Sequence, residues 1–289
     1  MRKTLKWFAI LAWSMMIFSA FAEQTLHATL VSQPPEIDGN ARDSVWANAP
    51  TITTMDRVAG IPVKLQAVHD NSNLFLKVVF PDKNETREHK TLVWDKTSGI
   101  YRTSFKREDF FVIKWNMNPF PVDLTLSSDQ SYKADIWYWK AYRTDHAGYA
   151  DDKYQLYSTA PTKKAQRLYS KQGNTFYLAR RGDAGQPAYS GTIFTEYVGD
   201  EVAGIKQRSP QGSRADVRAK GHWKNGYWTI EFARALDTGH GDDILLSRER
   251  RAQFGISRYE VAGREPNPTL DQPLAGSGEV GETLFLQLK

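Results

Sequence analysis

Apolar and polar side chains alternate at every second position along much of this sequence, and this feature restricts its fold more than any other. Residues 63–69 (VKLQAVH) and 74–80 (LFLKVVF) follow the pattern. Successive side chains of a strand point to opposite faces, so a period of two predicts half-buried strands rather than helices. The polar residues 70–73 between them favour a turn. We therefore expect an antiparallel hairpin.

A second hairpin is predicted closer to the C-terminus. Residues 217–223 and 227–232 flank a loop that contains Asn225-Gly226. This dipeptide accepts the positive φ angles of a tight turn between two strands. The last strands are expected at residues 252–259 and 283–288, which are again rich in β-branched and aromatic side chains.

Helical patterns are restricted to residues 41–46 and to parts of 130–153. The sequence therefore predicts an all-β fold, an immunoglobulin-like or jelly-roll-like antiparallel β-sandwich with a few short helices and long loops. Residues 159–211 are polar, and we expect them to form an insertion or a cap over one face. Residues 263–281 contain three prolines and four glycines, and they are expected to form a structured loop before the last strand.

The first 22 residues have the three parts of a secretory signal peptide. Three basic residues precede the apolar residues 7–18, and Ala20-Phe21-Ala22 matches a cleavage site. The apolar stretch is shorter than the roughly 20 residues that a membrane span needs. We expect cleavage near residue 23, one mature domain over residues 23–289 without a transmembrane span, and a periplasmic location.

Charge and cysteine content exclude several classes of function. The formal net charge is +5, and loss of the three basic residues of the leader lowers it to +2. The remaining basic residues are dispersed among acids, so no nucleic-acid partner is expected. The chain has no cysteine, which excludes covalent haem, iron–sulfur clusters and cysteine zinc sites. Since G-x-S-x-G, H-E-x-x-H and P-loop motifs are also missing, we expect no enzyme activity of the chain by itself.

The middle of the chain resembles a known family. The segments that carry this resemblance are 80–87 (FPDKNETR), 89–95 (HKTLVWD), 108–117 (EDFFVIKWNM) and 134–152 (ADIWYWKAYRTDHAGYADD). Together they resemble the haem-binding domain family of the ethylbenzene dehydrogenase γ subunit and related cytochromes. Residues 35–50 resemble the opening of family-nine carbohydrate-binding modules and related DOMON domains, which is a likeness of fold rather than of ligand.

The resemblance to the haem-binding family implies both a cofactor and a role. It implies a β-sandwich that holds b-type haem non-covalently between a sheet and the surrounding loops, with a Met and a Lys as axial ligands. It also implies electron transfer to or from a redox partner protein, either an oxidoreductase subunit or a membrane cytochrome.

Met117 is the first candidate ligand. A Met at the end of an apolar strand either fills a gap in the core or offers a thioether to haem iron. The resemblance favours the iron ligand, because Met117 matches the Met position of the family.

The family's Lys lies in a loop before the last strand, but residues 263–281 contain neither Lys nor His. For the second axial position we rank His146 first, His69 second and His222 third, although each of them can also be an ordinary hydrogen-bonded imidazole.

Four tryptophans are candidates for ligand contacts. Trp115, Trp137 and Trp139 are interpreted as walls of a porphyrin cavity or as ordinary core residues. Trp137 and Trp139 share one face if they lie on a strand. The competing function is a carbohydrate-binding module that stacks sugar rings on Trp137, Trp139 or Trp94.

Lys140 and Arg143 are candidates for contacts with the haem propionates, since Arg pairs well with carboxylates. Alternatively, they balance the charges of the acids that follow, which are Asp145, Asp151 and Asp152. These acids lack the spacing of a calcium-binding loop, so no metal site is predicted from them.

Overall fold

The computed structural model describes residues 23–56, 61–259 and 283–289. The predicted signal peptide, residues 1–22, and the predicted loop 263–281 lie outside the described residues. In chain order, the strands are β1 (Glu23–Leu30), β2 (Thr51–Asp56), β3 (Ile61–His69), β4 (Asn73–Pro81), β5 (Leu92–Asp95), β6 (Ile100–Thr103), β7 (Phe110–Asn116), β8 (Tyr132–Lys140), β9 (Asp151–Ser158), β10 (Gln166–Tyr169), β11 (Thr175–Gly182), β12 (Tyr189–Gly191), β13 (Glu201–Val202), β14 (Ile205–Gln207), β15 (Arg218–Lys224), β16 (Tyr227–Ala235), β17 (Ala252–Tyr259) and β18 (Thr283–Leu288).

The described helical segments are short. They are α1 (Val45–Asn48) and two 3-10 turns, η1 (Asp145–Ala147) and η2 (Gly212–Ala215). In the part of the chain that the structure describes, none of these segments has the length and apolar character that crossing a membrane requires.

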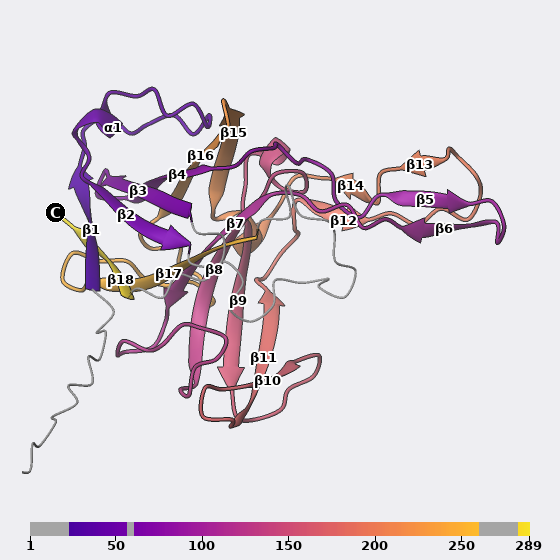
Figure 1. Cartoon of the computed structure of the whole chain (residues 1–289). Helices are drawn as coiled ribbons and strands as arrows, with labels where there is room; N and C mark the ends of the chain where they lie inside the picture. The colour runs from indigo at the N-terminus through magenta and orange to yellow at the C-terminus, as the bar shows by residue number, and fades with distance from the viewer. Residues whose placement is uncertain (1–22, 57–60, 260–282) are drawn as a thin grey trace, which may run out of the picture.

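One large sheet forms the body of the protein. Its strands run in the order β10-β11-β9-β8-β7-β17-β18-β1-β3-β4-β16-β15, with β2 paired to β3. The halves on either side of β17, β18 and β1 form two layers that face each other (Figure 1). β1 pairs in parallel with β18 and β3, and the other described pairs are antiparallel. The structure therefore confirms the predicted, mainly antiparallel β-sandwich.

Both predicted hairpins are present. β3 and β4 pair antiparallel from His69–Leu74 to Lys64–Val79. β15 and β16 are joined through Asn225 and Gly226, whose φ angles of 52° and 81° are the positive values that this tight turn requires. β17 and β18 have the predicted bounds.

The helical pattern predicted for parts of residues 130–153 is present only in a short turn. The region contains β8 and the start of β9, with only the short turn η1 between them. β8 lies between β7 and β9 and is covered on both faces by buried clusters. A strand that is buried on both faces loses the alternation of apolar and polar residues, and its pattern then resembles a buried helix. The helix expected at 41–46 is α1, which begins at Val45.

Strands from residues 159–211 belong to three different sheets. β10 and β11 extend the large sheet beyond β9. β12 and β14 form a two-stranded sheet, and β13 joins the β5–β6 hairpin. β5, β6 and β13 form an arm that extends away from the body, at the right of Figure 1.

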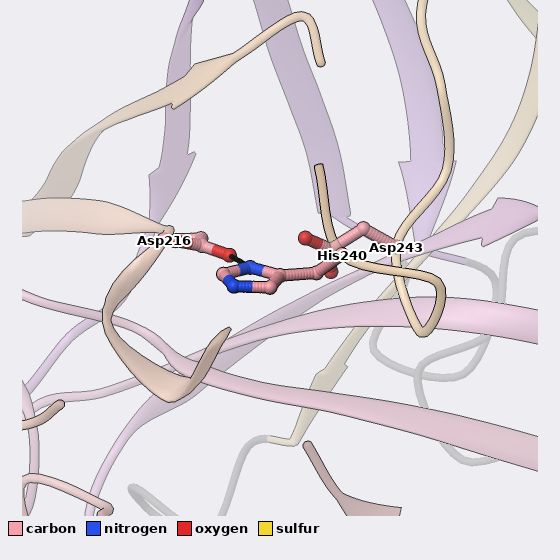
Figure 2. A group of neighbouring side chains, drawn as sticks. All are labelled: Asp216, His240 and Asp243. Atoms are coloured by element: carbon pink, nitrogen blue, oxygen red, sulfur yellow. Dashed lines mark hydrogen bonds and ion pairs between the residues drawn. The ribbon is translucent and has the colours of Figure 1, made fainter. Parts of the chain in front are cut away.

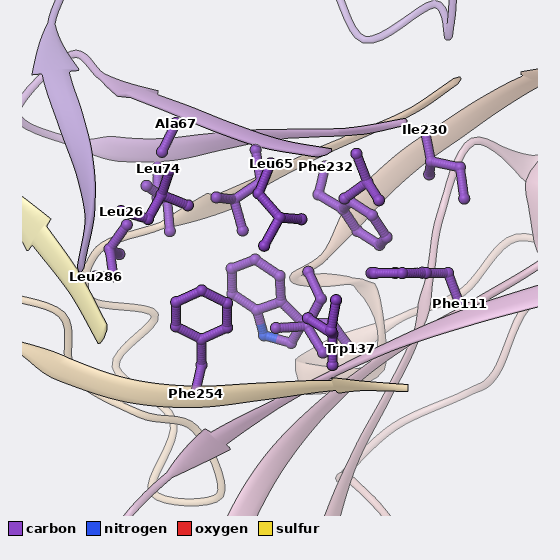
Figure 3. Close-up of a cluster of buried hydrophobic side chains, with 14 of the residues drawn as sticks. Leu26, Leu65, Ala67, Leu74, Phe111, Trp137, Ile230, Phe232, Phe254 and Leu286 are labelled. Carbon is purple, nitrogen blue, oxygen red and sulfur yellow. The ribbon is translucent and has the colours of Figure 1, made fainter. Parts of the chain in front are cut away.

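The main core lies between the two layers and is rich in aromatic rings. Phe111, Trp137 and Phe254 of one layer point toward Leu65 and Phe232 of the other (Figure 3). The ring centroids of Trp137 and Phe232 are 6.4 Å apart. Burial of such side chains is the main favourable contribution to the free energy of folding.

Trp46 of α1 closes one end of the sandwich. It is buried and belongs to a small cluster with Ala49, Val68, Phe75 and Ala233. Its Nε1 donates to Glu231 Oε1 (2.8 Å), and the backbone N–H of Gly39 donates to Glu231 Oε2 (2.9 Å). Burial raises the pKa of Glu231 to about 7, although these two hydrogen bonds favour the charged form.

Candidate functional site

Met117 lines a cavity at one end of the core. It directly follows β7, and its backbone N–H donates to the carbonyl of Lys133 (3.0 Å). Since side chains alternate along a strand, Met117 continues the inward-facing row of β7 that contains Trp115. The cavity has a volume of about 280 Å³ and is lined by Asn116, Met117, Asn118, Asp243, Ile244, Leu245, Ser247, Arg250, Arg251 and Ala252.

The loop that carries Met117 is held by hydrogen bonds on both sides. Asn116 Nδ2 donates to the carbonyl of Phe120 and to Gln253 Oε1, each at 2.8 Å. Arg250 Nη2 donates to the carbonyls of Asn118 (2.8 Å) and Pro119 (3.0 Å). These contacts join the loop to β17 and to the segment before it, and so they fix the backbone on both sides of Met117.

The lining residues match part of what a non-covalent haem requires. Met117 offers a soft axial ligand, Ile244, Leu245 and Ala252 offer apolar contacts, and the guanidinium groups of Arg250 and Arg251 suit propionates. The volume is close to the lower end of the range of about 300–1,000 Å³ for small-molecule sites. Among the described lining residues there is neither His nor Lys, so they offer no second nitrogen ligand for iron.

None of the three predicted histidines lines this cavity. His146 is exposed on η1, and its Nδ1 lies 3.2 Å from the carbonyl of Tyr142. His222 is exposed on β15. His69 is buried, with its Nε2 2.7 Å from the carbonyl of Lys289 and its Nδ1 accepting from the backbone N–H of Asn71 (3.3 Å). Iron ligation by any of them stays a prediction.

The three predicted cavity tryptophans lie in the core. Trp115, Trp137 and Trp139 are each 0% exposed. Trp115 and Trp137 contact each other at a centroid distance of 5.0 Å, and Trp139 Nε1 donates to Asp145 Oδ1 (2.8 Å). A side chain at Gly221 would come within 2.3 Å of the Trp139 ring, so that glycine makes room for it. Neither Trp137 nor Trp139 has an open face on which a sugar ring could stack, and none of the three lines the Met117 cavity.

Lys140 and Arg143 are paired inside the protein. Lys140 Nζ lies 2.5 Å from Asp151 Oδ2 and donates to the hydroxyl of Tyr189 (2.9 Å). Arg143 forms an ion pair with Glu108. Burial lowers the pKa of Lys140 to about 8, although Asp151 favours its charged form. Lys140 therefore balances Asp151 inside the protein rather than at the surface, Arg143 pairs with Glu108, and neither basic residue lines the Met117 cavity.

The sequence analysis did not predict the residues that line the cavity opposite Met117. They belong to residues 243–252, which follow β16 and end at the first residue of β17. The run of charged residues 248–251 before the start of β17 is a signal for an exposed rim. That signal does not show which strand end lies opposite, because the pairing of β17 with β7 depends on the whole sheet.

Comparison with known proteins gives one family and several solved structures. Residues 43–265 match the family described as Ethylbenzene dehydrogenase. The chain is similar to a carbohydrate binding module of family 9 from Caldicellulosiruptor kristjanssonii, solved in complex with glucose. The identity is 12% and the TM-score 0.38, over 92% of this chain and 96% of that chain. The chain is also similar to a family 9 module from the same organism solved in complex with cellotriose. The identity is 11% and the TM-score 0.39, over 93% of this chain and 95% of that chain. No curated protein sequence matches the chain. At this degree of similarity, the solved structures carry no conclusion about its ligand.

Proposed function

Since the chain belongs to the ethylbenzene dehydrogenase family, we propose that it binds b-type haem non-covalently and acts in electron transfer, with Met117 as one axial ligand. The observation that carries the proposal is the position of Met117, a half-buried thioether that lines a cavity with apolar and cationic walls. Haem, when bound, supplies the redox-active iron.

The residues around the cavity have separate tasks in this proposal. Met117 Sδ binds iron, and a Met ligand raises the reduction potential. Ile244, Leu245 and Ala252 offer apolar contacts to the ring, while Arg250, which also binds the loop carbonyls, and Arg251, which also pairs with Glu23, offer positive charge to the propionates. Because the described lining offers no His or Lys, any second ligand to the iron would come from outside it.

We also propose an exported protein with a redox partner. The leader-like residues 1–22 support export to the periplasm. Membership of the family supports an oxidoreductase subunit or a membrane cytochrome as the partner that gives or receives the electron.

The test is the visible spectrum of the full chain purified from haem-replete cells. We expect a Soret band and sharp reduced α and β bands, and in Met117→Ala these bands should shift or disappear. Met55→Ala is the matched control, because Met55 is an exposed methionine on β2. Its spectrum should equal that of the wild type. A colourless wild type, or identical spectra for both variants, would contradict the proposal.

A second candidate function is carbohydrate binding on the arm. Trp94 of β5 is half-buried, and its ring lies 5.0 Å from that of Tyr101 and 5.4 Å from that of Tyr197. Aromatic rings that remain partly exposed can stack on sugars. Retardation of the chain in gels that contain soluble glucans, lost in Trp94→Ala and kept in Met117→Ala, would favour this candidate over haem binding.

A further inference from the structure

A buried ion pair connects the two layers next to the Met117 cavity. Arg234 of β16 crosses to β8, where its Nη1 lies 2.6 Å from Asp135 Oδ2. Both side chains are 0% exposed. Asp243, which also lines the cavity, lies at 3.8 Å from the same Nη1.

Two buried carboxylates, those of Asp135 and Asp243, lie within 4 Å of this guanidinium, and Asp152 and Asp183 are buried beside them. Asp135 and Asp152 are 0% exposed, Asp183 is 6% exposed and Asp243 is 8% exposed. Asp135, Asp152 and Asp243 each present an oxygen within 4.8 Å of the oxygens of the other two. Asp183 follows β11, and its backbone N–H lies 3.5 Å from the carbonyl of Asp152, so it extends the group. We call Asp135, Asp152, Asp183 and Asp243 the acidic cluster.

Most oxygens of the acidic cluster accept no hydrogen bond from the described residues. Both oxygens of Asp152, both of Asp183 and Oδ1 of Asp135 and of Asp243 are buried without a hydrogen bond. The other oxygen of Asp135 accepts from Arg234 and from the N–H of Ile244 (3.1 Å), and that of Asp243 accepts from Thr238 (2.5 Å). A buried carboxylate without a partner is costly. Asp152 is the clearest case, because it is fully buried and directed at the other acids.

We propose that the acidic cluster binds one calcium ion between the two layers. Asp135, Asp152 and Asp243 each offer a carboxylate oxygen to the same point, and their second oxygens or water molecules would supply the rest of the six to eight oxygen ligands that calcium takes. Calcium–oxygen bonds of about 2.3–2.6 Å allow oxygens on opposite sides of the ion to lie up to about 5 Å apart. The oxygens of Asp135, Asp152 and Asp243 lie within 4.8 Å of one another and meet that limit. Two positive charges from the ion and one from Arg234 offset three of the four negative charges. The proposal does not depend on haem binding.

A neighbouring group of side chains is a poorer candidate for calcium. It consists of Asp216, His240 and the same Asp243 (Figure 2). His240 Nδ1 already lies 2.6 Å from Asp216 Oδ2, and the His240 side chain is 41% exposed. An imidazole suits zinc or copper better than calcium, which prefers oxygen. This group is therefore the natural comparison in the test.

The first measurement is calcium content and thermal unfolding of the full chain. After purification in calcium and desalting, elemental analysis should give one calcium per chain, which EDTA removes. With calcium at about 100 times its Kd, the midpoint of thermal unfolding should rise by roughly 5–10 °C over that in EDTA. A chain without bound calcium, and with the same midpoint in calcium and in EDTA, would overturn the proposal.

Variants then assign the ion to its ligands. Asp152→Asn should weaken calcium binding, measured by titration calorimetry, at least about tenfold. In EDTA the same variant should unfold at or above the wild-type temperature, since it removes one unpartnered charge. His240→Ala is the matched control and should bind calcium as the wild type does. Calcium binding that His240→Ala abolishes and Asp152→Asn leaves unchanged would assign the ion to the exposed group and overturn the proposal.

Discussion

Asp151 and Asp152 are neighbours in β9, but their carboxylates lie in opposite environments. Asp151 Oδ2 contacts Lys140 (2.5 Å) and Lys153 (3.0 Å), and its Oδ1 contacts Arg214. Asp152 has no partner for either oxygen among the described residues, and other acids surround it. Because successive side chains of a strand point to opposite faces, one step along the chain moves a carboxylate from a cationic cluster into an acidic one.

This difference separates a structural ion pair from a candidate binding site. Burial alone would raise the pKa of Asp151, but Lys140, Lys153 and Arg214 together hold it well below its usual value. For Asp152, burial and the repulsion of Asp135 both raise the pKa. Buried charges persist in proteins when they are paired or when they coordinate a metal. Asp151 meets the first condition within the described chain, and Asp152 meets neither without a further ligand.

The largest expected effect is the contrast between Asp151→Asn and Asp152→Asn in EDTA. Asp151→Asn leaves three buried or partly buried cations without their anion, and we expect it to lower the free energy of unfolding by about 3–5 kcal/mol. Asp152→Asn should leave the free energy of unfolding unchanged or raise it. Urea unfolding of both variants at one pH measures the contrast. Equal losses in the two variants would show that the two carboxylates have equivalent roles.

Glu231 adds a third type of buried carboxylate, one held by neutral donors. Its pKa is raised from 4.5 to about 7, so the folded chain binds this proton more tightly than the unfolded chain. The stabilisation by this proton is fully present below pH 4.5 and is lost as the pH rises through 7. The shift corresponds to about 3 kcal/mol. Between pH 4 and pH 8, the wild type should therefore lose about that much unfolding free energy relative to Glu231→Gln.

The measurement is chemical unfolding of both proteins at several pH values in EDTA. The difference between Glu231→Gln and the wild type should increase with pH, and most of the change should fall between pH 5 and 7. A difference that is constant over this range would mean that Glu231 stays charged in the folded chain. It would then resemble Asp151 more than Asp152.

The sequence predicted local features well and the partners of buried groups poorly. The tight turn at Asn225-Gly226 depends on two residues that are adjacent in the chain, and it was predicted correctly. β8 was missed because it is covered on both faces, which hides the period of a strand. Asp151 and Asp152 are adjacent in the sequence, but only Asp151 has cationic partners, and the folded sheet brings Lys140 and Arg214 to it.

The same limit applies to the candidate site. The resemblance to the haem-binding family, rather than its place at the end of an apolar run, singles out Met117, and Met117 does line a cavity. The opposite wall leads into β17, which pairs with β7 only in the assembled sheet, so no local pattern indicates it. Trp137 and Trp139 share a face of β8, as expected on a strand, but that face is the core between two layers.

The smallest expected effect concerns an exposed ion pair, and it tests whether burial causes the contrast between Asp151 and Asp152. Lys171 Nζ lies 2.7 Å from Asp123 Oδ2, and the two side chains are 57% and 33% exposed. Water and salt screen such a pair, so Lys171→Ala should lower the free energy of unfolding by less than about 1 kcal/mol, and by less still at high salt. Urea unfolding at low and high salt is the measurement, with Lys163→Ala as a control at another exposed lysine. A loss as large as that expected for Asp151→Asn would mean that proximity of opposite charges, rather than burial, sets the contribution of the buried pair.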